Sequence, residues 1–329
     1  MKTKILIFTI CLLIIYAGAI WTLDRINVGD ETILGKITLD DRKPGTHLGQ
    51  SLRRFRDIKE FRDVDILFCG SSHAYRGFDP RIFAAKGLKT FNMGSTSQTA
   101  INAYYLLKQY CDQLNPKLVI YEVYFGALLS EDGLESYYDL LNNAEFSFEI
   151  VEMALAARNP NAFNAMVSTY LDRIAQPLSE TKQKRFKKET YIYGGYCERK
   201  DSPVKIKFKN FGQVKVASIQ VEYLEKIIHF LQERGSTMLL VIHPLPKELL
   251  MNVANYPEVS QQFYALAEKH NIAYFDFNEY MELETYRHFK DDNHLNAAGV
   301  KIFNDALIDT LFQKGYFKLA ADLVNEASK

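Results

Sequence analysis

The chain has few cysteines and no excess of charge of either sign, and each absence excludes a class of protein. Its 40 basic residues balance its 40 acidic ones, so no overall positive field favours nucleic acid as a partner. The four cysteines are too scattered for a disulfide scaffold and form no CxxC pair. If the domain is exported into an oxidising compartment, one disulfide, between Cys111 and Cys197, is conceivable.

Residues 1–23 predict a transmembrane anchor. Lys2 and Lys4 precede an uncharged stretch from Ile5 to Leu23 that is long enough to cross a bilayer. Positive charge before this stretch and net negative charge after it favour an extracytoplasmic domain held at the cytoplasmic membrane. The alternative is a cleaved signal peptide, because Ala17-Gly18-Ala19 supplies small residues of the cleavage type. The domain would then be secreted or periplasmic.

The rest of the chain has the pattern of an α/β domain, and a hydrophobic fraction of 47% is ample for a buried core. After an expected stalk at 24–62, apolar runs alternate with helical periodicity over 63–318, before a C-terminal tail at 319–329. Strands are expected at 65–69, 89–92, 117–125, 238–243 and 272–276, and helices at 99–114, 216–234, 257–270 and 297–312. This alternation predicts a three-layer α/β/α sandwich with a mostly parallel five-stranded sheet.

Residues 128–213 interrupt the alternation and predict a helical insertion. Two helices are expected there, at 145–158 and 162–175. A basic stretch follows and leads into several tyrosines; its charged residues are Lys182, Lys184, Arg185, Lys187 and Lys188. Such a stretch suits an anionic glycan or lipid headgroup, and it equally suits a solvated surface.

Gly70-Ser71-Ser72-His73 directly follows the first predicted strand. Ligands of open parallel sheets bind beyond the carboxyl ends of the strands, which is where this string falls. Glycine permits a tight turn there, while Ser72 can expose its hydroxyl and point its backbone N–H at a developing oxyanion. The same string would also suit a simple turn.

Asp291-Asp292-Asn293-His294 precedes the last predicted helix. A serine hydroxyl needs an imidazole to take its proton, and the imidazole needs a carboxylate to hold its tautomer. Asp291 and His294 are three residues apart, so the carboxylate can meet one ring nitrogen while the other faces Ser72. Together the two strings predict a catalytic serine, base and orienting acid, although a capped, solvated loop would also fit the second string.

Asn92-Met93-Gly94 follows the second predicted strand and offers a further part of such a site. The backbone N–H of Gly94 is a candidate second oxyanion donor, and Asn92 would shape the loop. His73 and His243, which ends the fourth strand, are candidates for substrate contact or for packing. Asp292, His294 and His243 lack a recognised metal-ligand spacing, so we expect neither a metal nor a cofactor.

Gly70-Ser71-Ser72, Asn92-x-Gly94 and Asp291-x-x-His294 resemble blocks I, II and V of the SGNH (GDSL-like) hydrolase superfamily. The resemblance covers residues 63–127 and 214–314. It implies a flavodoxin-like fold, Ser72 as nucleophile, His294 as base and Asp291 as orienting acid, with oxyanion donors from the backbones of Ser72 and Gly94.

The chain departs from that family after the third strand. The Gly-x-Asn-Asp of block III is replaced by Tyr121-Glu122-Val123-Tyr124-Phe125-Gly126, so the asparagine that gives the third oxyanion donor is missing. Losing one such donor costs on the order of a hundred- to a thousandfold in rate. Tyr124 is a candidate replacement, although Tyr124 and Glu122 are equally expected as core side chains of the strand.

Together these features predict an extracytoplasmic SGNH-type serine esterase or O-acyltransferase that acts on acyl esters of a cell-envelope glycan through an acyl-Ser72 intermediate. The anchor and the missing asparagine also resemble a subgroup that includes D-alanyl transfer and alginate O-acetylation proteins. That resemblance implies an acylated glycan or acyl donor as substrate and a multi-span membrane acyltransferase as partner. The alternative is a catalytically silent envelope protein that binds a glycan or a partner on the same fold.

Overall fold

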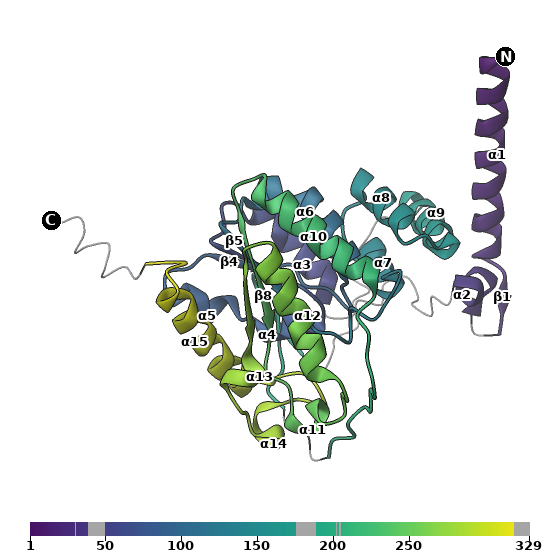
Figure 1. Ribbon diagram of the computed structural model, residues 1–329. Helices are drawn as coiled ribbons and strands as arrows, with labels where there is room; N and C mark the ends of the chain where they lie inside the picture. The colour runs from purple at the N-terminus through teal and green to yellow at the C-terminus, as the bar shows by residue number, and fades with distance from the viewer. Residues whose placement is uncertain (30, 39–49, 176–188, 202, 204, 319–329) are drawn as a thin grey trace.

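A five-stranded parallel sheet forms the centre of the structure, a computed structural model that describes residues 1–29, 31–38, 50–175, 189–201, 203 and 205–318 (Figure 1). Every pair of neighbouring strands is parallel. The strands, in spatial order, are β4 (Thr90–Asn92), β3 (Ile66–Cys69), β5 (Leu118–Glu122), β8 (Thr237–Ile242) and β9 (Ala273–Asp276). The expected three-layer α/β/α sandwich is therefore confirmed.

Helices cover both faces of the sheet because the strands are apolar on both sides. Leu67 and Val119 face one core, and Phe68 and Ile120 face the other. The first core is covered by α6 (Ala100–Leu114), α10 (Ser218–Gln232) and α12 (Tyr256–Lys269). The second is covered by α4 (Ser72–Gly77), α5 (Pro80–Ala84) and α15 (Ala297–Gln313).

Two of the helices on the second face begin at residues whose side chains cap them. Asp79 accepts a hydrogen bond from the N–H of Arg81, and Pro80 occupies the first turn of α5. Asn296 accepts from the N–H groups of Ala298 and Gly299 at the start of α15. Short helices follow β8 and β9 at the carboxyl edge of the sheet: α11 (Lys247–Leu250), α13 (Phe277–Tyr280) and α14 (Thr285–His288).

The expected stalk at 24–62 is wrong for its last part. Residues 51–60 form α3 (Ser51–Asp57) and the 3-10 helix η2 (Ile58–Glu60), which pack into the first core. Phe55 and Ile58 are almost fully buried there, so burial of apolar surface draws this segment into the domain. The tail at 319–329 lies outside the described residues.

The insertion contains more regular structure than the sequence predicts. Besides α8 (Phe148–Ala156) and α9 (Pro160–Ala175), it forms α7 (Leu134–Asn143) and a hairpin of β6 (Thr190–Ile192) and β7 (Tyr196–Glu198). The hairpin caps the edge strand β4, because the N–H of Asn92 donates to the carbonyl of Gly194. The basic run at 182–188 lies outside the described residues.

The N-terminal helix α1 (Lys2–Leu23) is apolar and exposed along most of its length, and it stands beside the insertion (Figure 1). Polar contacts join the C-terminal part of α1 and the residues after it to α9: Tyr16 with Asn164, Asp24 with Ser168 and Arg25 with Asp172. The pair β1 (Asn27–Val28) and β2 (Glu31–Thr32) and helix α2 (Ile33–Thr38) follow. Cys111 and Cys197 are both free thiols, so the bridge between them is not formed.

Candidate active site

Ser72 lies at the carboxyl end of strand β3, between β4 and β5 in the sheet, on the turn that leads into α4. Gly70 adopts a φ of 132°, and a Cβ there would lie 2.8 Å from the carbonyl oxygen of Glu122, so only glycine fits. Ser71 caps α4 by accepting a hydrogen bond from the N–H of His73. Ser72 is therefore the first residue of the helix, with its hydroxyl at the edge where the loops of the sheet meet.

The imidazole of His294 joins Ser72 to Asp291. Its Nε2 lies 2.8 Å from the Ser72 hydroxyl oxygen, and its Nδ1 lies 2.9 Å from Oδ1 of Asp291. The same carboxylate oxygen accepts the backbone N–H groups of Asn293 and His294. A proton on Nδ1 then satisfies Asp291 and leaves the lone pair of Nε2 for the serine hydroxyl.

The surroundings of the two side chains keep Asp291 charged and His294 neutral. Burial raises the pKa of Asp291, but the hydrogen bond and charge of His294 and two backbone N–H groups outweigh burial and hold that pKa well below its usual range. Burial and then the Arg76 guanidinium lower the pKa of His294, against the opposing effect of Asp291. His294 is thus poised as a base at neutral pH.

Arg76 is a residue of this site that the sequence analysis missed. Its Nη1 lies 3.3 Å from Nε2 of His294, and its guanidinium pairs at 3.1 Å with Glu189, which precedes the hairpin of the insertion. The available signal was spacing, because Arg76 is four residues after Ser72 and falls on the same face of α4. Glu189 gave no signal, since only the fold brings it to the site.

His73, Tyr124 and His243 meet at Asn293, the residue between the acid and the base. His243 Nε2 lies 3.4 Å from the Asn293 carbonyl, and the Asn293 carboxamide donates to the Tyr124 hydroxyl at 3.3 Å. The His73 ring stacks on that of His294, with the ring centroids 4.5 Å apart, and is tilted against that of Tyr124, with the centroids 3.7 Å apart. These contacts fix the loop that carries Asp291 and His294.

A second histidine and carboxylate pair lies beneath that loop. Nδ1 of His243 is 3.2 Å from Oε1 of Glu122, and both side chains are almost completely buried. Burial raises the pKa of Glu122, and the neighbouring His243 opposes that rise. With Nε2 of His243 turned toward Asn293, this pair supports the loop that carries Asp291 and His294 from below.

Asn92 holds the loop that contains Gly94 against α4. Its carboxamide nitrogen donates to the carbonyls of Ala74 and Phe78, and its Oδ1 accepts the N–H of Gly94 at 3.1 Å. A side chain at Gly94 would collide with Ala74 and Tyr75. The Gly94 N–H therefore lies near the start of α4, but it donates its hydrogen bond to Asn92. It must release Asn92 before it can donate to an oxyanion.

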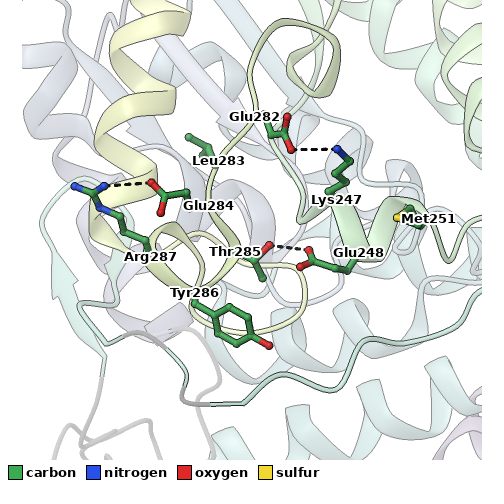
Figure 2. A pocket seen from close by; sticks show the side chains of 9 residues that line it. All are labelled: Lys247, Glu248, Met251, Glu282, Leu283, Glu284, Thr285, Tyr286 and Arg287. Carbon is green, nitrogen blue, oxygen red and sulfur yellow. Dashed lines mark hydrogen bonds and ion pairs between the residues drawn. The ribbon is translucent and has the colours of Figure 1, made fainter.

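A hollow of about 570 Å³ lies at the same edge of the sheet, between α11 and the segment that leads into the Asp291 loop (Figure 2). Three polar pairs cross it or line it: Lys247 with Glu282, Glu248 with Thr285, and Glu284 with Arg287. Within the part of the chain that the structure describes, no cluster of three or more His, Cys, Asp or Glu side chains is arranged to hold a metal ion.

No protein-family model matches this sequence, and no curated protein matches it. Among solved structures, a protein described as an acylhydrolase from Bacteroides fragilis is 12% identical, with a TM-score of 0.43 over 83% of this chain and 100% of that one. A GDSL-like lipase from Bacteroides thetaiotaomicron is 10% identical, with a TM-score of 0.43 over 81% and 98%. A catalytic mutant of an acetylxylan esterase from Geobacillus stearothermophilus is 12% identical, with a TM-score of 0.41 over 78% and 96%. At such values these matches carry no functional weight, and the chemistry has to be inferred from the site.

Proposed function

We propose that this protein is an SGNH-type serine esterase or O-acyltransferase that acts on acyl esters of a cell-envelope glycan. The observation that carries the proposal is the continuous chain of short contacts from Ser72 through His294 to Asp291. A nucleophile, a base and an orienting acid in hydrogen-bond reach are the parts that acyl transfer through a serine requires.

In the proposed reaction, Ser72 Oγ attacks the acyl carbonyl carbon while Nε2 of His294 takes the hydroxyl proton. The negative charge that develops on the carbonyl oxygen is stabilised by the backbone N–H groups of Ser72 and Gly94. The ester C–O bond then breaks, and His294 returns the proton to the departing alcohol oxygen. Water or a glycan hydroxyl attacks the acyl-Ser72 intermediate by the same steps in reverse.

The missing block III asparagine leaves one oxyanion donor unassigned, and Tyr124, two residues after the end of β5, remains the candidate. Its hydroxyl accepts from Asn293, which leaves its own hydrogen free to donate. Burial raises the pKa of Tyr124 by more than the hydrogen bond from Asn293 lowers it, so the phenol stays protonated. A protonated phenol is a competent donor to an oxyanion.

We further propose that α1 is retained and anchors the domain outside the cytoplasmic membrane. The helix is apolar, and very little of it is buried by the rest of the chain. Tyr16 of α1 and Arg25, just after α1, both make polar contacts with α9. These contacts lie on either side of Ala17-Gly18-Ala19, which supports a helix that is kept rather than cleaved. Anchoring favours an acyl donor that is supplied at the membrane, with a multi-span acyltransferase as the partner that delivers the acyl group.

The experiment that tests the catalytic proposal is labelling with a serine-directed fluorophosphonate. The native protein is expected to take one label, Ser72→Ala to take none, and Ser218→Ala, which changes an exposed serine of α10, to label normally. Equal labelling of Ser72→Ala and the native protein would contradict the assignment. If only Ser72→Ala loses the label, the intact mass of the native protein after exposure to acyl donors identifies the acyl group that Ser72 carries.

The competing function is a catalytically silent protein that binds a glycan or a partner at the same edge. A silent protein has no need to keep the lone pair of His294 directed at Ser72, so the 2.8 Å contact favours the enzyme. Binding of envelope glycan by a native protein that takes neither fluorophosphonate nor acyl donor would favour the silent protein instead.

A further inference from the structure

Arg76 is a charged side chain at the site to which the proposed reaction assigns no step. It lies one helical turn after Ser72 on α4, and its Nη1 is 3.3 Å from Nε2 of His294. This Nε2 of His294 also lies 2.8 Å from the Ser72 hydroxyl oxygen. The guanidinium therefore borders the place where protons are exchanged.

The two donors next to Nε2 share one lone pair. A guanidinium has only N–H donors, and a neutral imidazole nitrogen accepts one hydrogen bond in the ring plane. In the resting enzyme, Arg76 and the Ser72 hydroxyl both face that lone pair. Once Nε2 has taken the serine proton, it can no longer accept, and Nη1 of Arg76 is left without its acceptor.

We infer that Arg76 then donates to the alcohol oxygen of the ester. To receive a proton from Nε2, that oxygen must come within hydrogen-bond distance of it, which brings it within reach of Nη1 as well. The carbon–oxygen bond breaks, its electron pair goes to the alcohol oxygen, and the proton on Nε2 follows. Arg76 keeps its own protons and stabilises the negative charge.

Glu189 holds the guanidinium in the orientation that this role requires. Nε and Nη2 of Arg76 both lie 3.1 Å from Oε1 of Glu189, which leaves Nη1 for the site. The Glu189 side chain is only 3% exposed and that of Arg76 20%, so water screens the pair weakly. The insertion thus contributes to catalysis by fixing Arg76.

This role deepens the proposed function, on which it rests, by naming the class of ester. A sugar alkoxide is a poor leaving group that accumulates charge as the bond breaks, whereas an aryl oxide disperses its charge without help. A fixed cation on the alcohol side is useful for the first and nearly superfluous for the second. The site is accordingly built for alkyl esters such as O-acylated sugars.

The test compares an alkyl acetate with 4-nitrophenyl acetate as substrates of the full chain, above the pH at which His294 loses its proton. Arg76→Gln is expected to lower kcat/KM on the order of a hundredfold for the alkyl ester, and less than about tenfold for the aryl ester. Arg76→Lys should give an intermediate loss in the same order. Arg234→Gln, in the turn just after α10, should change neither value.

Equal losses for both esters would overturn the inference, because a purely structural defect lowers both alike. The proposed function is tested separately, since Ser72→Ala should abolish turnover of both esters whatever Arg76 does. If Arg76→Gln fails to fold, Glu189→Gln and Arg76→Lys carry the test, and both should penalise the alkyl ester more. Absence of that preference in folded protein, judged by an unchanged thermal midpoint, would again overturn it.

Discussion

Glu122 and His243 form a buried pair under the loop of Asp291 and His294, with Oε1 of the carboxylate 3.2 Å from Nδ1 of the imidazole. His243→Leu leaves Glu122 buried without its partner, and removing one member of a buried pair costs about 3–5 kcal/mol. We expect the double variant Glu122→Leu/His243→Leu to recover much of that loss. Urea unfolding of the single and double variants measures the difference in the free energy of unfolding. The full chain carries the apolar helix α1, so all the proteins are compared in the same detergent.

The pH dependence of the His243→Leu deficit follows from the same pair. Burial raises the pKa of Glu122 above the ordinary value of 4.5, so folding favours the protonated acid. The cost of the buried carboxylate is then absent at low pH and appears as pH rises through the folded pKa. The deficit should be smaller at a pH near 5 than near 8; a deficit independent of pH would contradict this account.

Asp291→Asn is expected to lower kcat by roughly ten-thousandfold. An asparagine can donate to Nδ1 of His294, which moves the proton to Nε2 and leaves no lone pair for Ser72. The matched control is Asp292→Asn, which changes the neighbouring carboxylate and should leave kcat within about tenfold of native. Steady-state hydrolysis of a chromogenic ester provides the measurement, and similar losses in both variants would argue against Asp291 as the orienting acid.

The acid limb of the pH profile should report His294. Burial and then Arg76 lower its pKa below the ordinary value of 6.5, so kcat/KM should rise with pH and level off once His294 is neutral, with the midpoint below pH 6.5. Removing the guanidinium in Arg76→Gln favours the imidazolium, and the midpoint should move up. A profile that moves down, or that moves equally in Arg234→Gln, would show that Arg76 does not act on His294.

Gly195→Ala tests how the insertion hairpin supports the site. Gly195 has a φ of 101°, and a Cβ there would lie 2.1 Å from the carbonyl oxygen of Asn92. Backbone strain alone costs about 1–3 kcal/mol, and the overlap adds to it. Gly212→Ala also has a positive φ but open space around it, so its cost should be roughly 1 kcal/mol. Thermal unfolding should rank the two variants in this order, and kcat should fall further in Gly195→Ala because Asn92 holds Gly94.

The sheet could be predicted from the sequence because its strands are continuous apolar runs separated by helical periodicity. The segment around Phe55 and Ile58 resembles a stalk in composition because its arginines dominate, while its apolar residues recur at the spacing of a helix that packs. Helix α7 is not evident from the sequence because its tyrosines and polar residues keep its overall hydrophobicity low, although its apolar side chains gather on one face.

The site divides in the same way between local and distant signals. Ser72, Asp291 and His294 stand in short motifs, and the fold brings them together, although their roles remain predictions until the variants are measured. The Glu122–His243 and Arg76–Glu189 pairs join segments far apart in the chain, and no periodicity or motif announces such a contact. Asn293 gives no signal in the sequence because a carboxamide between Asp291 and His294 looks like an ordinary loop residue.

The base and the nucleophile come from opposite ends of the chain, 222 positions apart. A chain that has been synthesised or exported only as far as the insertion carries Ser72 on its turn but has no imidazole to activate it, and a free serine hydroxyl is a weak nucleophile. Reactivity therefore appears only when the last strand and helix have docked. Under the proposed mechanism, an unfinished or misfolded copy therefore cannot form an acyl-enzyme, because it lacks the base.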